Sequence, residues 1–118
     1  MESDHRRDAQ EAAARLASAV HTYRRFVEGL AHLEWDPQRY KVAADLFAYM
    51  EAEAKRLPAV RLQWLEVLIS RFEFTHAWWE ARHASKGMDC LAARKGRHLG
   101  ALERLLSGCA ESGGDAQS

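Results

Sequence analysis

The sequence predicts an all-α protein, and three observations support that fold class. Alanine, leucine, glutamate and arginine, which favour helices, dominate the 118 residues. The chain has only two prolines, and no segment alternates apolar with polar residues as a half-buried strand does. Because four amphipathic segments are joined by short connections, we expect a four-helix antiparallel bundle of the up-down-up-down kind.

The first two helices are predicted from their apolar spacing and their start signals. The first is expected over residues 4–33, where apolar residues recur in steps of four and three, as in a heptad seam. This seam consists of Ala9, Ala13, Leu16, Val20, Tyr23, Val27 and Leu30. The second helix is expected over residues 37–56, because Asp36 is a favourable N-cap and Pro37 is tolerated at the first helical position. Its buried face is expected to contain Ala43, Leu46, Phe47, Met50, Ala54 and Leu57.

The third and fourth helices are predicted from proline, glycine and aspartate. Pro58 cannot continue the hydrogen-bond ladder of the second helix, so we expect a tight turn there and a third helix that begins at Pro58 and runs to residue 86. Gly87 is expected to end that helix as a left-handed cap, and Asp89 to cap the fourth helix. The buried side of the fourth helix is expected to contain Leu91, His98, Leu102, Leu105 and Cys109.

The chain is long enough for one domain, which we expect over residues 1–108. The first and third helices are expected to be longer than the other two, so the bundle has unequal helix lengths. Residues 109–118 are small, polar and rich in glycine, and are predicted to form a flexible, disordered tail. The N-terminus has neither the apolar segment of a signal peptide nor a membrane span, so we expect a cytoplasmic protein with reduced cysteines.

The third helix is unusual because it has two apolar faces. One face holds Leu62, Leu65, Leu68, Ile69, Phe72 and Trp79, and is expected to pack on the core. The other holds Trp64, Val67, Phe74 and Trp78, with Arg71 beside them. A bundle needs to bury only one such stripe, so the second requires cover from other helices of the chain or from another molecule. We interpret these five residues as a possible interface for a homodimer or another protein.

The same helix carries a possible metal motif. Glu73-x-x-His76 and Glu80-x-x-His83 lie one heptad apart, and such pairs supply metal ligands in some helical bundles. The other helices offer no matching carboxylates on their expected inner faces. Buried or interfacial histidines that form hydrogen bonds are the alternative, and no cofactor is predicted.

Basic residues cluster in the fourth helix at Arg94, Lys95 and Arg97. They are candidates for contact with an acidic protein or with phosphate, and weak association with nucleic acid through them is an alternative function. The chain as a whole has 17 basic and 17 acidic residues, which does not favour nonspecific binding of nucleic acid. The sequence shows no arrangement of nucleophile and base typical of a catalytic site. The function that it favours is therefore non-enzymatic protein association, as a regulatory or adaptor protein, and the alanine- and arginine-rich composition suits a bacterial source.

Overall fold

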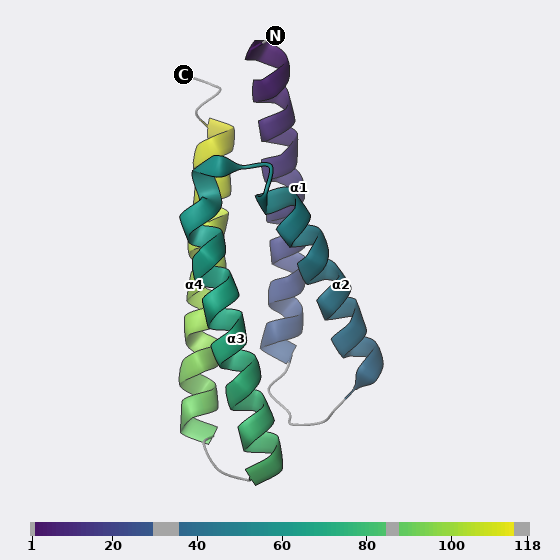
Figure 1. The fold of residues 1–118 in the computed structure, drawn as a ribbon, viewed down its shortest axis with the longest axis vertical. Helices are drawn as coiled ribbons and strands as arrows, with labels where there is room; N and C mark the ends of the chain where they lie inside the picture. Colours follow the sequence, from purple (N-terminus) through teal and green to yellow (C-terminus); the bar gives the residue numbers. More distant parts are fainter. Residues whose placement is uncertain (1, 30–35, 85–87, 115–118) are drawn as a thin grey trace.

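We analysed a computed structural model of the protein, which describes residues 2–29, 36–84 and 88–114. The described residues form four α-helices and one short 3-10 turn. These elements are α1 (Glu2–Gly29), α2 (Pro37–Ala54), η1 (Pro58–Val60), α3 (Arg61–Ala84) and α4 (Met88–Gly114). Successive helices run in opposite directions (Figure 1). The predicted all-α, up-down-up-down bundle is therefore confirmed.

The helices pack in the order α2, α1, α4, α3. α1 contacts both α2 and α4, and α4 contacts both α1 and α3. α2 and α3 meet near the turn that joins them and then diverge, so that their far ends are well separated (Figure 1). The molecule is elongated, with dimensions of 55 × 25 × 17 Å. None of the four described helices is both long enough and apolar enough to cross a membrane.

The turns around α2 follow from local chemistry. The carboxylate of Asp36 accepts hydrogen bonds from the backbone amides of Gln38 at 3.0 Å and Arg39 at 3.3 Å, so its predicted role as N-cap is confirmed. Leu57 lies outside the helical region, with φ −123° and ψ 83°, because the proline that follows disfavours the α conformation. Pro58 then opens η1, which leads directly into α3.

The last helix differs from the prediction. α4 has 27 residues and is longer than α3, which has 24, so only α2, with 18, is short. α4 also begins at Met88, which places Asp89 inside its first turn, not at the N-cap. It continues to Gly114, so the predicted disordered tail is wrong for residues 109–114. Cys109 is buried, and its packing extends the helix past the predicted boundary at residue 108. Three predicted features lie outside the described ranges. They are the helix end at residue 33, the cap at Gly87 and the tail over residues 115–118.

The predicted inner faces of α1, α2 and α4 are confirmed within the described residues, with Ala9, Ala43 and Leu46 partly buried against the core, and Leu30 lies outside those residues. The α1 seam is buried from Ala13 to Val27, and all five residues predicted on the inner side of α4 are buried. Gly108 allows α4 to approach η1 closely, because a Cβ atom there would lie 3.0 Å from Cγ1 of Val60. These contacts produce one continuous core.

Ion pairs cross three of the helix contacts. They include Arg15–Glu53 at 3.2 Å between α1 and α2, Arg24–Glu103 at 2.9 Å between α1 and α4, and Arg104–Glu66 at 2.7 Å between α3 and α4. Lys95 of α4 donates a hydrogen bond of 3.1 Å to the carbonyl of Glu28 in the last turn of α1, where a cation also complements the helix dipole.

Candidate interaction surface

A buried polar chain connects α1, α4 and α3 at the centre of the bundle. His98 of α4 has no solvent exposure. Its Nε2 atom lies 2.8 Å from the hydroxyl of Tyr23 on α1, and its Nδ1 atom lies 2.8 Å from the hydroxyl of Ser70 on α3. The hydroxyl of Ser70 donates to the carbonyl of Val67 at 3.1 Å.

These partners determine the tautomer of His98. Because Ser70 gives its only hydroxyl proton to Val67, its oxygen must accept a hydrogen bond from the Nδ1–H of His98. Nε2 is then unprotonated and accepts from the hydroxyl of Tyr23. Both ring nitrogens are therefore satisfied, as a buried polar group requires.

Burial keeps this chain uncharged. Desolvation, together with the nearby positive charge of Arg71, lowers the pKa of His98 to about 4. Burial raises the pKa of Tyr23 to about 12. The imidazole and the phenol are both neutral at pH 7, and we interpret the chain as a structural connection that holds α3 in one orientation.

α3 turns its smaller residues toward α4. Ala77 and Ala81 are 5% and 1% exposed and lie on the same side of the helix as Ser70. Small side chains in a helix contact allow the two axes to approach each other. At the edge of this contact, Glu73 pairs with Arg94 and lies 3.5 Å from Arg97, both on α4. The orientation of α3 is thus set by small residues, a buried hydrogen bond and ion pairs together.

The residues predicted as an interface lie on this inner side. Trp64, Val67, Phe74 and Trp78 are between 0% and 9% exposed. Arg71 is half-buried, and its guanidinium lies 4.1 Å from the ring centroid of Phe47 on α2. The prediction that these residues form an exposed interface is therefore wrong. The missed signal was Ser70, Ala77 and Ala81, because the prediction counted only large apolar residues.

The face predicted to be the core is turned outward except for Leu68, which is partly buried and packs against the core. Seven residues form this surface, which we call the outer stripe. They are Leu62, Leu65, Ile69, Phe72, His76, Trp79 and His83. The exposed fractions are 73% for Leu62, 50% for Leu65, 53% for Ile69, 74% for Phe72 and 53% for Trp79. The sequence thus correctly predicted two apolar faces on this helix but exchanged the inner and the outer one.

The four residues of the possible metal motif do not converge. Glu73 is engaged by the arginines of α4. Nε2 of His76 lies 3.6 Å from Oε1 of Glu80 at the surface, and Nδ1 of His83 donates to the carbonyl of Trp79 at 3.0 Å. Within the residues that the structure describes, no three histidine, cysteine, aspartate or glutamate side chains are grouped to hold a metal ion.

The three basic residues of α4 are directed to partners in the chain. Arg94 and Arg97 face Glu73 on α3, and Lys95 binds the backbone of Glu28 at the end of α1. These contacts use the cations to join helices. Arg97 nevertheless remains 64% exposed, so contact of this cluster with phosphate stays a prediction.

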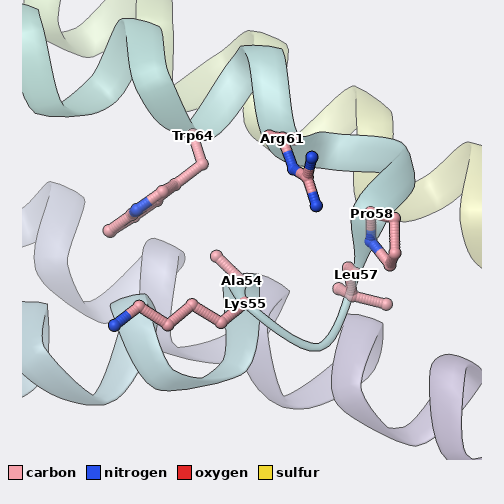
Figure 2. A pocket seen from close by; sticks show the side chains of 6 residues that line it. All are labelled: Ala54, Lys55, Leu57, Pro58, Arg61 and Trp64. Carbon is pink, nitrogen blue, oxygen red and sulfur yellow. The ribbon is translucent and has the colours of Figure 1, made fainter.

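A small pocket lies where α2 and α3 begin to diverge. Figure 2 shows the side chains of Trp64 and Lys55 on its opposite sides. It is lined by Ala54, Lys55, Leu57, Pro58, Arg61 and Trp64. Its volume of about 130 Å³ is below the roughly 300 Å³ at which pockets for small organic ligands begin. We interpret it as a consequence of the helix divergence.

Comparison with known proteins identified no relative of this chain. No protein-family model, no curated protein and no solved structure matches it.

Adjacent tryptophans test the orientation of α3. Trp78 is buried and Trp79 is half-exposed. Trp78→Glu is expected to lower the free energy of unfolding by at least about 3 kcal/mol, because it places a charge in the core and removes a large apolar side chain. Trp79→Glu should change the unfolding free energy of the monomer by no more than about 0.5 kcal/mol. Urea denaturation at low protein concentration measures both, and equal losses would contradict the assigned orientation.

The ionisation of His98 predicts a pH dependence of stability. The unfolded histidine has a pKa of about 6.5, whereas the folded one has a pKa of about 4. Between these values the unfolded state binds the proton more strongly, so stability falls as the pH decreases from about 6.5 to 4. The expected loss is on the order of 3 kcal/mol, measured by urea denaturation at several pH values. His98→Gln should show a flatter profile over this window, and a profile parallel to that of the unaltered protein would contradict the assignment.

Proposed function

We propose that this protein acts through protein–protein association, first with a second copy of itself, and that the outer stripe of α3 is the contact surface. The observation that carries the proposal is the exposure of five large apolar side chains along one side of a single helix. Isolated exposed apolar residues are normal, but a continuous row of them is typical of an association site.

The size of the surface supports a dimer. The exposed parts of the seven side chains amount to an area on the order of 700 Å². A standard protein interface buries about 800 Å² on each partner. A two-fold dimer, which is the commonest form of oligomer, would cover the outer stripe of each copy with that of the other.

The aromatic residues of the outer stripe are suited to binding another protein. Phe72 stacks on His76 with ring centroids 6.4 Å apart, and Trp79 meets His83 edge-on with centroids 3.8 Å apart. Aromatic side chains lose little conformational entropy on binding when they are already held in place, and they are enriched among residues that dominate binding energy. A reducing compartment such as the cytoplasm fits this proposal, since Cys90 and Cys109 are both free thiols.

Phe72→Glu is expected to weaken self-association by at least about 30-fold, because it places a charge in the middle of the outer stripe of both copies. The monomer should keep its helical content, since Phe72 is 74% exposed and contributes little to the core. Sedimentation equilibrium over a wide concentration range gives the dissociation constants, and circular dichroism reports the fold.

Ala93→Glu is a matched control, because it adds the same charge to an exposed helical residue outside the outer stripe. It should leave the dissociation constant of the dimer unchanged. An unaltered protein that remains monomeric at high micromolar concentration would contradict the proposed dimer. Equal effects of the two substitutions would show that the outer stripe is not the contact surface.

A further inference from the structure

We propose that the two copies associate with their α3 helices parallel and in register, as a two-stranded coiled-coil contact between bundles. This inference rests on the proposed self-association and specifies its geometry. The residues of the outer stripe recur in strict steps of three and four from Leu62 to His83, which is the spacing that keeps one helix in continuous contact with another. The inner face of α3, by contrast, packs against two different helices.

The heptad assignment favours a coiled coil of two helices. Positions a are Leu62, Ile69, His76 and His83, and positions d are Leu65, Phe72 and Trp79. In parallel coiled coils, a β-branched residue at a with leucine at d favours a dimer. Ile69 and Leu65 follow this preference in the part of the stripe nearest to η1.

The distribution of polar residues along the stripe distinguishes the two possible directions. The portion between residues 62 and 72 is entirely apolar at positions a and d, whereas both histidines lie between residues 76 and 83. In a parallel, in-register contact, apolar layers meet apolar layers, and each histidine meets the same histidine of the other copy. An antiparallel contact would instead place His76 against Leu65, so that its Nδ1 atom would lose water without gaining a polar partner in the other copy, while Nε2 keeps Glu80.

The charges beside the stripe favour the same direction. The positions that follow each d residue are all glutamates, namely Glu66, Glu73 and Glu80, and the position before Leu62 is Arg61. A parallel contact brings Arg61 of one copy next to Glu66 of the other. An antiparallel contact brings the glutamates of the two copies together. Glu66 and Glu73 are partly neutralised by arginines of α4, so the remaining repulsion is greatest at Glu80.

Disulfide trapping at residue 65 tests the direction. The protein carries Leu65→Cys in a background with Cys90→Ser, while Cys109 remains, because it is buried and its thiol pKa is raised to about 11. In the parallel contact, the two introduced cysteines lie opposite each other at position d. Mild oxidation should therefore shift the band on a non-reducing gel from monomer to dimer, and a reductant should reverse the shift.

A second cysteine variant, His76→Cys, makes an antiparallel contact directly detectable. An antiparallel contact places residue 65 opposite residue 76, and the two copies of residue 65 then lie roughly 16 Å apart, beyond the reach of a disulfide. A mixture of the Leu65→Cys and His76→Cys proteins would then form a mixed disulfide. Ala93→Cys, outside the stripe, measures random collisions.

The outcomes separate this inference from the proposed function. A dimer that forms the mixed disulfide, or that forms no disulfide between the two copies of residue 65, overturns the parallel alignment and leaves self-association intact. An unaltered protein that is monomeric at high micromolar concentration overturns both. Efficient trapping at residue 65, with only background trapping at residue 93, supports the parallel contact.

Discussion

The hydrogen bond from His98 to Ser70 holds α3 at one rotation about its own axis, and the other features of the bundle depend on that rotation. α3 has enough apolar residues on opposite sides to pack on α4 in two ways. With the outer stripe turned inward, His98 would lose its acceptor on α3, and a buried imidazole without that partner is unfavourable by about 1–3 kcal/mol. The same rotation places the small side chains of Ala77 and Ala81 in the helix contact.

The contacts between α3 and α4 combine interactions that respond differently to salt and to pH. The buried chain through His98 is shielded from salt but sensitive to acid, since burial lowers the pKa of the imidazole. The ion pairs of Glu66 and Glu73 with α4 lie nearer to the surface, and salt weakens such pairs. These glutamates also mark the boundary between the inner face and the outer stripe. Glu66 and Glu73, which help to orient α3 within its own chain, therefore also form the edge of the surface that α3 offers to a partner.

The sequence was sufficient to predict the fold class, the start of α2 and three of the four inner faces. In α1, α2 and α4 the apolar residues occupy one side, so periodicity alone determines which side is buried. α3 is different, because Trp64 and Phe74 on one side are matched in bulk by Leu65 and Phe72 on the other. The local sign of the inner side is the row of small residues Ser70, Ala77 and Ala81, but the partner that makes Ser70 decisive, His98, is brought there only by the tertiary fold. The extension of α4 to Gly114 was missed for a related reason, since packing around Cys109 outweighs local propensity.

The position of Trp79 has a practical consequence for spectroscopy. Its indole is half-exposed near the C-terminal end of the outer stripe, which holds no other tryptophan, whereas Trp64 and Trp78 are enclosed by the core and Trp35 lies outside the described residues. Indole fluorescence moves to shorter wavelength when water leaves its surroundings. The emission of Trp79 is consequently an intrinsic, label-free reporter of whether the outer stripe is wet or covered.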